Sequence, residues 1–132
     1  MNFQNVDFNN IDWHDSYIEN VFVKYNCAIL NIFNDTCKML LSVKCTGFIG
    51  ISNLCFFDDT IIFDAHTVPV DLKKDEFVGW IYSEYGKDGF KYCDQEYDFT
   101  RGFLEIRFKM VNNTTLSLYC QNIEISEVGD AL

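Results

Sequence analysis

The densest group of chemically versatile side chains is the run Asp12-Trp13-His14-Asp15. Carboxylates that flank an imidazole can bind a metal ion, or they can orient the histidine as a general base. The same Asp-x-His spacing recurs at Asp64-Ala65-His66. Because two histidines and two carboxylates suffice to bind a divalent metal, one hypothesis is a metal-dependent enzyme. Its site would combine His14, Asp15, Asp64 and His66.

A structural interpretation of the same run is stronger. An Asp or Ser at the start of a strand commonly accepts hydrogen bonds from nearby backbone amides, and the pair Trp13 and His14 is suited to close the end of a sandwich. The chain has only two histidines, and Gly47-Phe48-Ile49-Gly50 lacks the Lys-Ser or Lys-Thr of a phosphate-binding loop. We therefore assign no catalytic residue and expect no cofactor.

Acidic residues outnumber basic ones by twenty to ten, which gives a formal net charge of −10 over 132 residues. This balance argues against nucleic-acid binding, since phosphate recognition normally needs a basic face. It favours capture of a basic partner protein, whereas a solvated strand surface is the plainer interpretation of an acidic stripe. The residues expected to bind the partner are Asp12, Trp13, His14, Asp15, Asp58, Asp59, Asp94, Glu96 and Asp98.

The first ten residues are polar and contain no Lys or Arg, so they lack the pattern of a signal peptide. The sequence contains no run of about eighteen apolar residues, so it predicts no transmembrane helix. We expect a cytoplasmic protein without a membrane partner, whose cysteines stay as free thiols in a reducing compartment. Five of the six cysteines lie in or beside apolar runs, at Cys27, Cys45, Cys55, Cys93 and Cys120.

Alternating and apolar runs bounded by Asn, Asp or Gly predict strands joined by short turns. The exception is Leu72 to Tyr85, where helical spacing places Trp80 in a buried stripe, Asp71 is the expected N-cap and Gly86 can end the helix. The expected strands are Tyr17–Tyr25, Cys27–Phe33, Lys38–Cys45, Phe48–Phe57, Thr60–Asp64, Phe90–Phe99, Phe103–Met110 and Thr115–Ile125. The first five suggest an antiparallel meander.

Eight strands and one helix in a chain of this length predict one β-rich domain over residues 1–132, all-β or α+β with a single helix. The expected architecture is an antiparallel β-sandwich or a strongly curved sheet, with the helix covering an edge or an open end. In this arrangement Asp94, Glu96 and Asp98 form an acidic stripe on the outer face of one strand.

The run Ile11-Asp12-Trp13-His14-Asp15-Ser16-Tyr17-Ile18 resembles the start of a group of small bacterial β-rich proteins with an N-terminal His-Asp-Ser or His-Asp-Ala signature. Some of these are grouped with immunity proteins of polymorphic toxin systems. The later segments Leu104 to Phe108 and Cys120 to Ile125 are similar in layout. The resemblance implies an intracellular, non-catalytic, largely β protein that binds a cognate toxin, and His14 and Asp15 match the signature.

The leading functional hypothesis is therefore a cytoplasmic binding protein, an immunity-type inhibitor that masks a basic partner. Two alternatives belong to other classes. One is the metal-dependent enzyme that uses the two Asp-x-His pairs. The other is a β domain that binds a carbohydrate or another ligand, with aromatic side chains lining a cleft.

Overall fold

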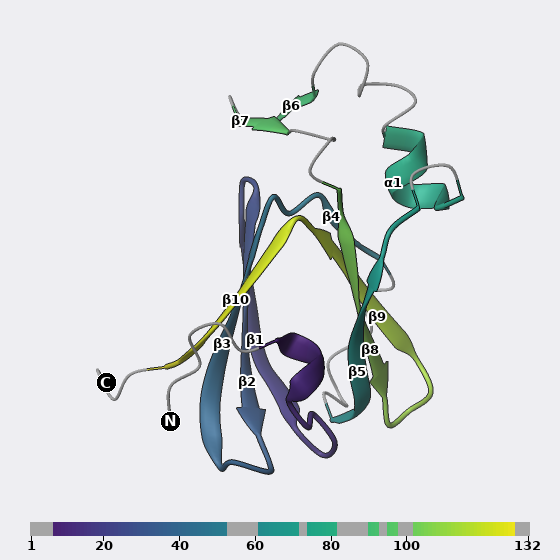
Figure 1. The fold of residues 1–132 in the computed structure, drawn as a ribbon. Helices are drawn as coiled ribbons and strands as arrows, with labels where there is room; N and C mark the ends of the chain where they lie inside the picture. Colours follow the sequence, from purple (N-terminus) through teal and green to yellow (C-terminus); the bar gives the residue numbers. More distant parts are fainter. Residues whose placement is uncertain are drawn as a thin grey trace.

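The computed structural model describes residues 7–52, 61–71, 74–81, 90–92, 95–97 and 102–128. Two four-stranded antiparallel sheets face each other, and this confirms the predicted all-β sandwich with one helix (Figure 1). The first sheet has the order β1-β2-β3-β10, with bounds Tyr17–Lys24, Cys27–Asn34, Met39–Thr46 and Asn122–Glu127. The second has the order β4-β9-β8-β5, with bounds Gly50–Ser52, Thr115–Cys120, Leu104–Met110 and Ile62–Pro69.

Strands β1, β2 and β3 form a meander, and their bounds agree with the prediction to within one residue. The alternation along β2 turns Ala28, Leu30 and Ile32 into the core, where each is fully buried. Tyr25 adopts φ 56°, as the predicted tight turn at Tyr25-Asn26 requires. The predicted meander ends after β3, because β4 pairs with β9 in the other sheet.

The prediction of a single strand from Thr115 to Ile125 is wrong. The chain forms β9 in one sheet and β10 in the other, with only Gln121 between them. Leu116 and Leu118 reach the core from one layer, whereas Ile125 reaches it from the opposite layer. This crossing closes the sandwich along one side, as the yellow-green part of the ribbon shows (Figure 1).

The strand expected at Thr60–Asp64 is also displaced. Strand β5 continues to Pro69, so Asp64-Ala65-His66 lies within the strand rather than after it. A bulge at Phe63 interrupts its pairing with β8, since Ile62 faces Met110 and Asp64 faces Lys109. After the bulge, β5 continues to pair with β8 as far as Pro69, although the alternation of buried and exposed residues shifts at Phe63.

Helix α1 spans Glu76–Ile81 in the described part of the chain, and it begins four residues later than expected. The Asp75 carboxylate accepts a hydrogen bond from the Val78 amide at 2.8 Å, so Asp75 and not Asp71 caps the helix. Trp80 is 58% exposed, which contradicts its assignment to a buried stripe. Residues 72–73 and 82–89 lie outside the described part of the chain.

The expected long strand Phe90–Phe99 is replaced by two short ones. Strands β6 (Phe90–Tyr92) and β7 (Gln95–Tyr97) pair with each other antiparallel, so residues 90–97 do not form one continuous strand. Glu96 belongs to β7. Four of the other predicted binding residues lie outside the described residues, namely Asp58, Asp59, Asp94 and Asp98. Of the strand expected at Phe48–Phe57, residues 48–52 are described, and β4 (Gly50–Ser52) is the strand among them.

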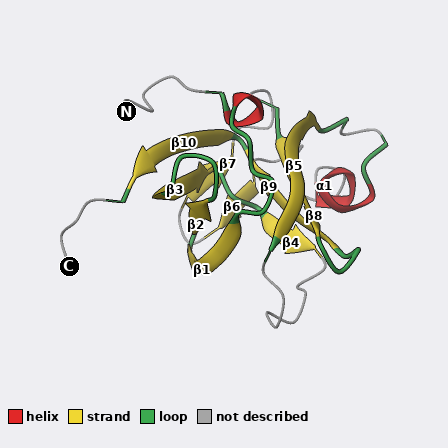
Figure 2. Cartoon of the chain, turned by 90° about the horizontal axis from the view of Figure 1, so that it is seen from below, coloured by secondary structure: helices red, strands yellow, loops and turns green. Residues whose placement is uncertain are grey.

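The 3-10 helix η1 (Phe8–Asn10) lies between the edge strands β10 and β5, whereas α1 lies on the outer side of the second sheet (Figure 2). The indole of Trp13 is 2% exposed, stacks on Phe8 at 4.8 Å between ring centroids and donates a hydrogen bond to the Phe8 carbonyl at 3.0 Å. Phe8 meets Phe108 edge to face at 5.9 Å. Trp13 therefore packs in the core between the sheets, whereas His14, which was expected to close the end of the sandwich with it, is exposed.

The described residues contain no helix with the length and apolar character needed to cross a membrane.

Candidate functional site

The segment from Asp12 to Tyr17 joins the two sheets. The Asp15 amide donates to the Ile62 carbonyl at 2.9 Å, and the Ile62 amide donates to the Ser16 carbonyl at 2.7 Å. Tyr17 forms an isolated bridge with Ile61. The signature residues are therefore held by backbone contacts with Ile61 and Ile62, where the edge strand β5 begins.

Side chains of the same segment fix the turn between β2 and β3. One carboxylate oxygen of Asp12 accepts from the His14 amide at 3.0 Å, and the Asp12 carbonyl accepts from the side chain of Asn34 at 2.9 Å. The Ser16 hydroxyl, which is buried, accepts from the Asp35 amide at 3.1 Å. The expectation that an Asp and a Ser at this strand entry bind backbone amides is confirmed.

His14 is exposed at the junction between the sheets. Its Nδ1 donates to the Phe63 carbonyl at 2.9 Å, and its Nε2 lies 3.4 Å from a carboxylate oxygen of Asp15. The hydrogen bond to Phe63 and the charge of Asp15, with smaller contributions from Asp12 and Asp35, raise the pKa of His14 above its ordinary 6.5. These contacts favour an imidazolium that is paired with carboxylates and tied to the backbone.

The structure does not assemble the metal site of the enzyme hypothesis. His14, Asp15, Asp64 and His66 are all described, yet no three His, Cys, Asp or Glu side chains among the described residues lie close enough together to hold a metal ion. The physical reason is that His14 is engaged with the backbone of Phe63, whereas His66 pairs with Asp64 at 3.8 Å on exposed positions of β5. The two Asp-x-His segments form separate pairs.

Exposed apolar side chains gather around this junction. Of the eight large apolar side chains that are exposed in the described residues, four belong to residues at this junction: Tyr17, Ile61, Phe63 and Val111. Ile61 and Phe63 flank the buried Ile62 and therefore point outward, and the Val111 amide donates to the Ile61 carbonyl at 3.0 Å. With the neighbouring polar residues they form what we call the seam patch, which consists of Asp12, His14, Asp15, Tyr17, Ile61, Phe63 and Val111.

The aromatic side chains of the seam patch contact other rings and one lysine. The His14 ring meets Phe63 edge to face at 5.5 Å, and Tyr17 stacks on Phe33 at 5.4 Å. Nζ of Lys109 lies 5.3 Å from the centroid of Phe63. Phe63 and Tyr17 each therefore have an aromatic or cationic neighbour, although both are exposed.

The sequence pattern does not identify the apolar residues of the seam patch. Ile61 and Phe63 belong to a short apolar run that also holds the buried Ile62, so residue type alone did not separate the outward side chains from the inward one. The available signal was that three consecutive apolar residues cannot all face the core of a sandwich when one of its surfaces meets water.

A second unexpected group lies on the outer face of the second sheet. Glu105 alternates with the core residues Ile106 and Phe108 along β8, yet its side chain is only 10% exposed. Arg107 donates to both carboxylate oxygens, at 2.9 and 3.1 Å, and the Ser117 hydroxyl donates at 2.8 Å. Burial alone would raise the pKa of Glu105, but the hydrogen bonds from Arg107 and Ser117 outweigh it and lower the pKa below the ordinary value.

Comparison of the chain with family models, curated proteins and solved structures found no match.

Proposed function

We propose that this protein binds a basic partner protein in the cytoplasm through the seam patch, in the manner of an immunity-type inhibitor. The observation that carries the proposal is that the exposed residues Tyr17, Ile61, Phe63 and Val111 lie at one junction of the backbone, together with Asp12 and Asp15. Exposed apolar groups that adjoin each other and are rimmed by polar residues are typical of protein-binding surfaces.

The two carboxylates of the patch outnumber its one cationic side chain, His14, and favour a basic partner. The side chain of Asp15 is 59% exposed, and Asp12 is also exposed, so both carboxylates can face an approaching protein. The formal net charge of −10 adds a long-range attraction for a positively charged surface. The apolar side chains then provide contact area, and the carboxylates provide orientation and a faster association.

The proposal is tested by affinity capture from a lysate of the native host, with the tagged protein and two matched double variants. Phe63→Ala with Asp15→Asn alters the patch, and Asn tolerates the positive φ of 61° at position 15. Phe22→Ala with Glu124→Gln removes the same groups from exposed positions outside the patch.

We expect one partner to be retained at low salt by the wild type and by the control, and about tenfold less by the patch variant. Retention should fall at about 1 M salt, where the screening length shrinks to about 3 Å. Equal retention by the two variants, a partner indifferent to salt, or no partner at either salt concentration would contradict the proposal.

A further inference from the structure

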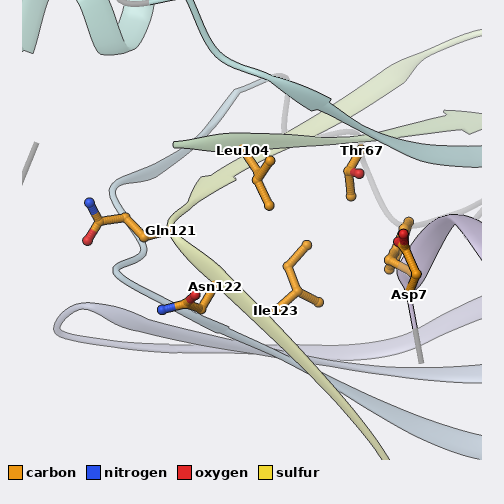
Figure 3. Close-up of a pocket in the computed structure, with 7 residues that line it drawn as sticks. Asp7, Thr67, Leu104, Gln121, Asn122 and Ile123 are labelled. Atoms are coloured by element: carbon orange, nitrogen blue, oxygen red, sulfur yellow. The ribbon is translucent and has the colours of Figure 1, made fainter. Parts of the chain in front are cut away.

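A cavity of about 270 Å³ opens between the two sheets, beside η1 (Figure 3). Leu104 of β8 and Ile123 of β10 point toward each other across it from opposite sheets, and Phe8 contributes a buried ring. β10 and β5 are edge strands of their sheets, and Gln121 and Asn122, where the chain passes from β9 to β10, also line the cavity. It is separate from the residues of the seam patch.

Two polar side chains at the η1 side of the cavity keep unused hydrogen-bonding capacity. Oδ1 of Asp7 accepts from the Asn9 amide at 3.0 Å, but within the described residues Oδ2 has no partner. Thr67 Oγ1 accepts from the Asn9 side chain at 2.9 Å, which occupies one of the two lone pairs of the hydroxyl. A ligand with several donors can therefore reach one carboxylate oxygen and one hydroxyl oxygen.

The charge in the cavity is of one sign. Among the residues that line it, all of which are described, Asp7 is the sole ionisable one, and the other polar side chains are neutral. A carboxylate beside an apolar wall attracts a cation that can also bury a hydrocarbon body. An ammonium group has three donors and no acceptor, which matches the two acceptor oxygens.

The size of the cavity limits the ligand. At about 30 Å³ for each water-sized group, 270 Å³ holds about nine of them. We propose that the cavity binds a small primary amine in its ammonium form, with the charged nitrogen at Asp7 and Thr67 and an aliphatic body between Leu104 and Ile123. This proposal does not depend on the protein-binding function.

The test uses n-hexylamine, which has seven non-hydrogen atoms, and the full-length protein labelled with ¹⁵N. We expect saturable shifts of the amide signals of Thr67, Leu104 and Ile123, with a dissociation constant of about 1 mM. Hexanoate has the same length and the opposite charge, so it should cause no saturable shift. A response to both compounds, or shifts confined to signals outside the cavity, would overturn the proposal.

Two matched variants test whether the carboxylate of Asp7 is the group that binds the ammonium ion. Asp7→Asn keeps a good N-cap for η1 and should weaken hexylamine binding about tenfold, since it removes a charge-assisted hydrogen bond. Glu124→Gln changes the net charge equally at an exposed position on β10 and should leave the affinity unchanged. Equal weakening by both variants would mean that hexylamine responds only to overall charge, and would refute a site at Asp7.

Discussion

Nδ1 of His14 lies 2.9 Å from the carbonyl oxygen of Phe63, and the two rings meet edge to face at an interplanar angle of 82°. His14 precedes the first sheet, whereas Phe63 occupies the bulge in the edge strand of the second. One side chain therefore connects the two layers, and its protonation state is coupled to their association. The carboxylate of Asp15 at 3.4 Å reinforces the protonated form.

The first prediction concerns pH. Because the pKa of His14 is raised in the folded state, its contribution to stability is complete below the ordinary pKa of 6.5 and is lost as the pH rises through the folded pKa. The melting temperature of the wild type should therefore fall relative to that of His14→Gln as the pH rises from about 5 to 8. NMR titration of the His14 ring in native and urea-unfolded protein tests whether the pKa of His14 is higher in the folded state. Identical titration midpoints in the two states would contradict it.

The second prediction concerns the buried carboxylate of Glu105. Glu105→Gln preserves the volume but replaces the charged partner of Arg107 and Ser117, so we expect a loss of about 1–2 kcal/mol near neutral pH. Since the pKa of Glu105 is lowered, this stabilisation is present above the ordinary 4.5 and disappears as the pH falls through the folded pKa. Urea unfolding should show that the difference in unfolding free energy between the wild type and Glu105→Gln is smaller at acidic pH than at neutral pH. The exposed Glu124→Gln serves as the control and should stay within about 0.5 kcal/mol.

The sequence predicts the meander of β1, β2 and β3 well because local rules decide it. Alternation along β2 and the turn at Tyr25 are readable from neighbouring residues alone. The break at Gln121 is harder to see, because apolar residues continue on both sides. Its signal is a slip in the alternation, since Leu118 and Cys120 face the core two residues apart but the next core-facing residue is Ile123, three residues later.

The candidate site was predictable only in part. The roles of Asp12 and Ser16 as acceptors are local, so the run around them indicates strand-entry hydrogen bonds. The partnership of His14 with Phe63 depends on contacts across 49 positions of sequence, and no spacing rule specifies such a pair. The burial of Glu105 likewise depends on what covers the outer face of its sheet, which alternation along a strand does not report.

The third prediction concerns thiol reactivity. Cys45 and Cys120 are fully buried, as expected for free thiols in apolar runs, and the pKa of Cys45 is raised by its hydrogen bond with Cys120 and by burial. The thiolate is the reactive form, so iodoacetamide should modify Cys37, which is half-buried, well before Cys45 or Cys120. Mass spectrometry of the peptides measures the order, and the difference should vanish in urea. Modification of Cys45 in the native protein at the rate of Cys37 would contradict the buried pair.

The last prediction compares two glycines. Gly47 and Gly102 both have positive φ, 63° and 76°, so an alanine at either position costs about 1–2 kcal/mol of backbone strain. At Gly102 an added Cβ meets nothing within 4 Å, whereas at Gly47 it would lie 2.7 Å from Cβ of Gln121.

Gly47 and Gln121 belong to the two connections that pass from one sheet to the other, β3 to β4 and β9 to β10, and the Gln121 amide donates to the Thr46 carbonyl at 2.9 Å. Because this bond holds the two connections together, the backbone of Gln121 cannot retreat without breaking it. We therefore expect Gly47→Ala to cost about 1–3 kcal/mol more than Gly102→Ala in urea unfolding. Equal losses would mean that the two connections can separate, and that the crossing does not depend on close packing at Gly47.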